Sequence, residues 1–230
     1  MVNEPSTTAA GCGQKRVLAA SVLTTAGLTA CTSARPHAPS GLATSPAASI
    51  LQKVVAATSA AAPVHVNVTL RAGSRAVIYS DDSLPGSGRQ VITISNGGHA
   101  VVLVLNQIGY INANSEALRT FFGFPAEVAA RFAHRWISFK RGQSGYQAVT
   151  ADVTVSGVIS ELRLRAPLAT LPSATTGGRL VVRIRGAVPA AEGAPAGTTA
   201  VIDVAAAGRV LPVSMQTSFG NDRSVVTFSD

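Results

Sequence analysis

The sequence has 230 residues, of which 47% are apolar and only 13% are charged. This composition excludes an intrinsically disordered chain, which combines low hydrophobicity with high charge. A polytopic membrane protein is excluded as well, because no stretch of eighteen apolar residues occurs. The formal net charge is +8, so anionic partners such as nucleic acid or a membrane surface have to be judged from the positions of the charges.

Residues 1–30 have the organisation of an export signal. A polar segment ends in Lys15-Arg16, and the uncharged stretch 17–30 follows it. A basic flank, a short apolar region and small residues at the end are typical of such a signal. The sequence LTAC at positions 28–31 resembles the bacterial lipobox, whose cysteine is acylated and becomes the first residue of the mature protein. We therefore interpret residues 1–30 as a lipoprotein signal peptide and Cys31 as the lipidation site. An ordinary secretory signal with an incidental cysteine is the alternative.

Residues 31–49 are interpreted as a tether between the lipid anchor and a folded body. They contain three prolines among serine, threonine and alanine, and almost no large apolar residue, so they cannot form a core. Acylation of Cys31 would hold the protein on the extracytoplasmic face of the cell membrane. The other cysteine, Cys12, lies within the signal, so the mature chain has no disulfide.

The first half of the body, residues 50–230, begins with a helix and continues with strands. Apolar residues recur at helical spacing from Ile50 to Thr58, and Pro63 ends the helix. Strict alternation over residues 64–71 predicts a half-buried strand. Residues 81–88 read as a turn, and strands follow at 90–95, 99–105 and 110–113, with an Asn-Gly-Gly hairpin turn at 96–98. Asn114 or Ser115 then caps a helix.

The second half is helical at first and then entirely extended. A helix is predicted over 126–134 and a short extended piece over 135–139. Residues 147–165 contain both an alternating pattern, at 152–156, and helical spacing; we favour a helix that ends before Pro167. Strands are predicted over 179–185, 200–205, 210–219 and 223–228. The order of elements indicates an α+β domain with one antiparallel sheet, polar on one face and apolar on the other.

No sequence motif of a common enzyme class is present, and we predict a protein that is not an enzyme and needs no cofactor. His65, His99 and His134 are far apart in sequence and are interpreted as surface or interfacial residues, so no metal site is predicted. Asp81 and Asp82 form a carboxylate pair, but in a segment rich in proline and glycine we interpret them as solvated turn residues.

The basic residues do not form a recognition motif. Arg179, Arg183 and Arg185 alternate along one strand, which is typical of a solvated face that discourages edge pairing; attraction to anionic lipid head groups is the alternative. An exported, membrane-anchored protein is not expected to bind nucleic acid. We expect a monomer.

The body resembles the actinobacterial lipoproteins of the LppX/LprG group, which share the LolA-like fold. The resemblance rests on the lipobox with its tether, on GYINANSEALRTFFG at 109–123, on AARFAHRWISF at 129–139, and most closely on TTAVIDVAAAGRVLPVSMQTSFGNDRSVVTFSD at 198–230. It implies a curved antiparallel sheet, a half-barrel wrapped around helices, with an apolar cavity for acyl chains. The partner it implies is a lipid or lipoglycan, and the function is lipid binding with transfer across the cell envelope.

We assign the cavity lining to inward positions of three predicted strands. Few aromatic residues and many small ones leave room for guest acyl chains. A regulatory or scaffolding lipoprotein that binds a protein and carries no lipid is the alternative. The predicted lining residues are Val66, Val68, Leu70, Leu180, Val182, Ile184, Leu211, Val213, Met215 and Phe219.

Overall fold

The computed structural model describes residues 41–189, 195 and 197–229. The expected signal peptide, Cys31 and most of the expected tether therefore lie outside the described residues. Helix α1 begins at Ala47, three residues before the boundary at residue 50 that the sequence predicts, and Leu42 and Ala43 ahead of it already pack against the buried core. In the described part of the chain, no helix has the length and apolar character needed to cross a membrane.

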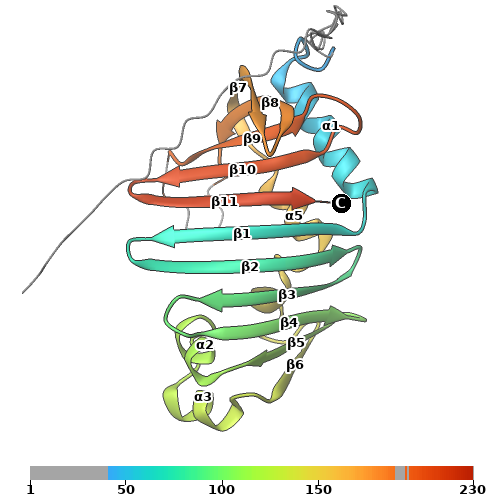
Figure 1. Cartoon of the computed structure of the whole chain (residues 1–230). Helices are drawn as coiled ribbons and strands as arrows, with labels where there is room; N and C mark the ends of the chain where they lie inside the picture. The colour runs from blue at the N-terminus through green and yellow to red at the C-terminus, as the bar shows by residue number, and fades with distance from the viewer. Residues whose placement is uncertain (1–40, 190–194, 196, 230) are drawn as a thin grey trace, which may run out of the picture. The chain divides into compact units, whose positions relative to one another are not determined.

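Within the described residues, eleven strands form one open antiparallel sheet in the order β6-β5-β4-β3-β2-β1-β11-β10-β9-β8-β7 (Figure 1). The first and last strands of the chain pair at its centre, where Val68 lies opposite Val226. The strands are β1 (Val64–Ala72), β2 (Arg75–Leu84), β3 (Ser87–Ile94), β4 (His99–Leu105), β5 (Ile108–Ala113), β6 (Trp136–Lys140), β7 (Arg165–Thr176), β8 (Arg179–Ala187), β9 (Thr199–Ala205), β10 (Pro212–Phe219) and β11 (Asp222–Ser229).

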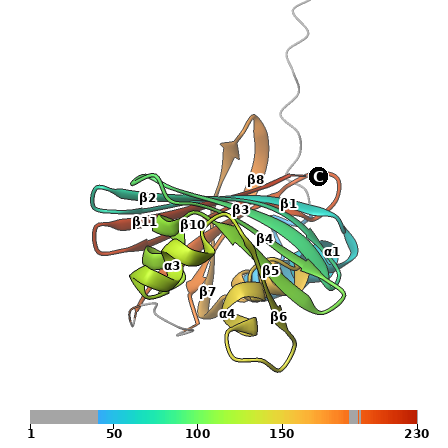
Figure 2. The ribbon, with the colours of Figure 1, turned by 90° about the horizontal axis from the view of Figure 1, so that it is seen from below.

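Helices cover one face of this sheet, which we call the inner face (Figure 2). They are α1 (Ala47–Ala60), α2 (Ser115–Thr120), α3 (Ala126–Phe132), α4 (Tyr146–Thr150) and α5 (Val155–Glu161). Most are too short to be stable alone, so packing against the sheet holds them in place. The sheet is curved and does not close, and the predicted α+β half-barrel is confirmed.

Two separate apolar clusters stabilise the fold. In the first, α1 and α5 pack on β1 and on the strands β8–β11, and fully buried members include Ile50, Leu162 and Ile202. In the second, α2, α3 and α4 pack on β3–β5, around Leu118 and Ile111. Each buried aliphatic side chain of this size contributes about 1.5–3 kcal/mol. The sheet is thus covered in two places, with a gap between them.

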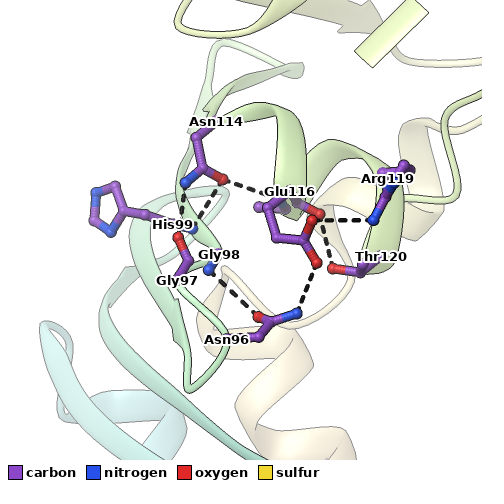
Figure 3. Close-up of polar contacts among 9 residues, drawn as sticks. Asn96, Gly97, Gly98, His99, Asn114, Glu116, Arg119 and Thr120 are labelled. Atoms are coloured by element: carbon purple, nitrogen blue, oxygen red, sulfur yellow. Dashed lines mark hydrogen bonds and ion pairs between the residues drawn. The ribbon is translucent and has the colours of Figure 1, made fainter. Parts of the chain in front are cut away.

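Asn114 joins helix α2 to the β3–β4 hairpin (Figure 3). Its side-chain oxygen accepts a hydrogen bond from the Ala117 amide at 2.9 Å, and its nitrogen donates to the Gly97 carbonyl at 2.8 Å. Asn96 in the same turn donates to Glu116 at 2.7 Å. Of the two residues predicted to cap this helix, Asn114 is therefore the N-cap. The cap fixes α2 and the Phe121-Phe122 pair that follows it.

Three sequence-based assignments need correction. The helix predicted over 147–165 is broken into α4 and α5 by residues 151–154. Pro167 does not follow a helix but lies in the edge strand β7, where proline is tolerated because one side of the strand needs no donors. The turn predicted over 81–88 is confined to Pro85-Gly86, and Asp81 and Asp82 belong to β2.

Candidate functional site

A cavity of about 180 Å³ lies on the inner face, beneath β1, β2 and β11. It occupies the gap between the two apolar clusters, since its lining includes members of both. Strands form one wall, and α4, α5 and the segment after α2 form the other. The apolar lining residues are Val66, Val68, Leu70, Val102, Val226 and Phe228 on the strands, and Phe121, Phe122, Ala148, Val149 and Val158 opposite them.

The connection between α4 and α5 is held close to the sheet. A Cβ atom on Gly88 of β3 would lie 2.0 Å from the Val153 carbonyl oxygen, and one on Gly157 would lie 1.9 Å from that of Ala151. The buried Ser83 hydroxyl donates to the Val153 carbonyl at 3.1 Å. These close approaches require glycine. The contacts of Val153 with Ser83 of β2 and Gly88 of β3 hold the connection against these strands, and its residue Asp152 lines the cavity.

One end of the cavity is acidic. Asp81 on β2, Asp152 in the connection and Glu161 at the end of α5 all line the cavity, and their charges act on one another. The other polar residues that line the cavity are Tyr79, Gln90 and Ser224. Asp81 is only 3% exposed. Glu161 also lines the cavity but keeps exposed surface as a residue, and partial burial of its carboxyl group raises its pKa. None of the lining residues is basic.

Burial and mutual repulsion shift the pKa values of these groups upwards. Desolvation raises the pKa of Asp81 to about 7; a hydrogen bond from Gln90 opposes the shift, and the neighbouring carboxylates Glu161, Asp152 and Asp82 add to it. Desolvation, followed by repulsion from Asp152, raises the pKa of Glu161 to about 7. Desolvation is also the main cause that raises the pKa of Tyr79 to about 12. Shifted pKa values of this kind are common at functional sites.

The structure brings three of the ten predicted lining residues to the cavity, namely Val66, Val68 and Leu70. The other seven do not line it. Val182, Ile184 and Met215 are buried in the first apolar cluster, because α1 and α5 fill the space over β8–β10. Leu180 is 45% exposed, and Phe219 borders a separate open hollow at the β10–β11 turn.

Leu211 and Val213 miss the cavity because the register of β10 shifts. Pro212 pairs with Val204 and Ser214 with Asp203, so Val213 lies in a bulge and both predicted residues are only half-buried. Bulges reverse the face that subsequent residues present. The alternation of apolar and polar residues in the sequence does not reveal where a bulge occurs.

The assignment of Asp81 and Asp82 to a solvated turn is wrong, and it hid the acidic end of the cavity. In β2 they point to opposite faces. Asp81 lines the cavity, whereas Asp82 is exposed and lies 2.7 Å from His65 Nδ1. Tyr79, two residues before Asp81, and Ser83, two residues after it, lie on the same face of β2 as Asp81. This alternation is typical of a strand, but it is hard to recognise because the side chains on that face are polar.

The arginines of β8 also differ from the prediction of one solvated face. Arg179 and Arg185 are exposed, but Arg183 donates from Nε to the buried Asp203 at 3.2 Å. Ser214 and Thr176 donate to the same carboxylate at 3.1 and 2.8 Å. Arg183 therefore compensates a buried charge.

An open antiparallel sheet with helices and a cavity on one face defines the LolA-like class of fold. The fold is similar to that of the lipoprotein LppX from Mycobacterium tuberculosis, with a TM-score of 0.51 and 17% identity over 82% of this chain and 93% of that one. A second neighbour is LprF from Mycobacterium bovis, with a TM-score of 0.46 and 17% identity over 84% and 93%.

The resemblance to the LppX group predicted from the sequence is thus confirmed as a likeness of fold. No model of a protein family matches the sequence, and no curated protein matches it.

Proposed function

We propose that this protein is an envelope lipoprotein that binds an acyl chain of a lipid or lipoglycan in the cavity beneath β1, β2 and β11. The observation that supports this is the lining. Valine, leucine and phenylalanine side chains from both walls face an unfilled space in a domain whose neighbouring regions are tightly packed. Apolar cavities of this kind are the usual sites for apolar ligands.

The volume limits how much of a lipid is held. A methylene group occupies roughly the volume of a water molecule, about 30 Å³, so 180 Å³ accommodates about six methylenes. Their burial is worth about 5 kcal/mol at about 0.8 kcal/mol each. One chain segment fits, and a lipid with several chains would keep the others outside or require the walls to separate.

A direct test is mass spectrometry of organic extracts from the native protein, purified without detergent. We expect one class of lipid, co-purifying in a constant ratio to protein. Extracts that contain no lipid, combined with failure to bind any short-chain amphiphile, would contradict the proposal.

The membrane anchor is the second part of the proposal. We propose that Cys31 carries the acyl groups and holds the body at the extracytoplasmic face of the cell membrane, with transfer of lipid across the envelope as its role. Two or more chains are needed because a single chain gives only reversible binding.

For the variant Cys31→Ala we expect release into the medium or accumulation of unprocessed precursor, since no other attachment is predicted. Fractionation in high salt with immunoblotting measures this, and Cys12→Ala is the matched control that should stay anchored. Tight membrane association of Cys31→Ala in high salt would refute the anchor.

The second candidate is a scaffolding lipoprotein that binds a protein partner, and it rests on Trp136. This side chain is 53% exposed on the edge strand β6, whose outer side has no partner strand among the described residues. Exposed aromatic residues are enriched at protein interfaces. A protein with an empty cavity that captures a partner only while Trp136 is intact would favour this candidate.

A further inference from the structure

The acidic end of the cavity is unusual for a site that holds only hydrocarbon. Carboxyl groups in an apolar cavity are costly unless they are paired or protonated. Asp81 and Glu161 come from different elements, β2 and α5, and they converge on the same space. No basic side chain lines that space to compensate them.

Asp81 lines the cavity, and one of its carboxyl oxygens has no hydrogen-bond partner. This oxygen, Oδ1, is fully buried. A buried acceptor without a donor destabilises the folded protein. A bound group that donates a hydrogen bond would remove this destabilisation.

The chemistry of the donor follows from the surroundings. In the described part of the chain, no group of three or more His, Cys, Asp or Glu side chains is arranged to hold a metal ion. An anionic head group would be repelled by the carboxylates. An alkylammonium ion has both a chain for the valine wall and three donors with a positive charge for the acidic end.

We propose that the guest of this cavity carries a primary ammonium group, held by Asp81 and Glu161 while its chain lies against Val66, Val68 and Val226. The inference rests on the proposed function, because it assumes that the cavity takes an apolar chain. It adds the chemical class of the guest, an amine-bearing amphiphile.

Proton release accompanies such binding. The groups that act on the carboxyl of Asp81 are Tyr79 on the same face of its strand, Asp82 on the opposite face, Gln90 on β3, Asp152 in the connection and Glu161 on α5. An ammonium ion favours the ionised form of both carboxyls, so it lowers their raised pKa values. At pH 7 the cavity therefore releases protons when it binds the amine.

The test uses three probes with the same eight-carbon chain: octylammonium, octanol and octanoate. We expect lipid-free protein to bind octylammonium about tenfold more tightly than octanol, and octanoate most weakly, as a charge-assisted hydrogen bond predicts. Calorimetry at pH 7, in two buffers of different ionisation enthalpy, should detect proton release with octylammonium and none with octanol. The chain carries a net positive charge, which repels cations in general, so this preference must arise locally.

Asp81→Asn should abolish the preference for octylammonium over octanol and the proton release from residue 81. Glu161→Gln should reduce the preference and the proton release. Asp82→Asn is the matched control, because it removes the adjacent carboxylate from the opposite face of the same strand; Asp82 is the smallest of the causes that act on the pKa of Asp81, so this variant should leave both nearly unchanged. Equal binding of the three probes, or an equal loss in Asp82→Asn, overturns the inference while leaving chain binding intact. If none of the probes binds, the proposed function itself fails.

Discussion

Raising the pH from 5.5 to 8.5 should destabilise the lipid-free protein. The native pKa of Asp81 is raised from 3.8 to about 7, so the folded state holds a proton that the unfolded state has lost. The stabilisation from Asp81 is complete below the pKa that this group has in the unfolded state, and it is lost as the pH rises through the pKa of the folded state. Between pH 5.5 and 8.5 this amounts to about 2 kcal/mol, because the native carboxyl stays protonated over about 1.5 pH units of that interval.

Glu161 acts in the same direction, since its pKa is also raised, from 4.5 to about 7. A loss of about 2 kcal/mol corresponds to a fall in melting temperature of about 4–8 °C for a domain of this size. Melting followed by circular dichroism at several pH values would measure it. Most proteins lose stability on acidification in this range, or change little, so the direction is diagnostic.

Two variants separate this effect from other titrating groups. Asp81→Asn removes the ionisable group and should flatten the pH dependence, leaving the variant more stable than the parent at pH 8.5. Asp82→Asn, on the exposed face beside His65, should keep the parent's slope. A parent whose melting temperature does not fall with pH would contradict the protonated cavity.

Alternation of residue types predicted the strands whose two faces differ in polarity. In β1, inward Val64 and Val66 alternate with outward His65 and Asn67, and the pairing with β11 keeps that register. The Asn-Gly-Gly turn and the Asn114 cap could also be predicted from the sequence, because the local chemistry of these residues determines both. The likeness of the whole fold was predicted from the lipobox with its tether and from three sequence segments, of which residues 198–230 contain β9, β10 and β11.

The site was predicted less completely because it departs from those local rules. The inner face of β2 carries Tyr79, Asp81 and Ser83, polar groups that line the cavity or hold its covering connection. Such positions lack the apolar alternation that marks a strand, and departures of this kind are typical of functional sites. Which strands lie over a gap also depends on how far α1 and α5 extend across the sheet, and a sequence pattern does not encode that distance.

Filling the cavity should abolish lipid binding without unfolding the protein. In Val68→Trp, an indole group would enter the space between β1 and α5 that we assign to the acyl chain. Overpacking a dense core costs about 1–3 kcal/mol, but an empty cavity has room for part of the added volume. We therefore expect a melting temperature within a few degrees of the parent, and extracts without the co-purifying lipid.

Matched controls decide whether the cavity is responsible. Val225→Trp makes the same change on the opposite face of the neighbouring strand, where Val225 pairs with Thr69, so it should keep both fold and lipid. Ile202→Trp inserts the indole into the filled cluster under α1 and α5, where the parent side chain has no exposed surface, and should lower the melting temperature markedly. If Val68→Trp melts as early as Ile202→Trp, this part of the sheet is already packed. If instead it melts normally and still carries the parent's lipid, the chain lies elsewhere on the molecule.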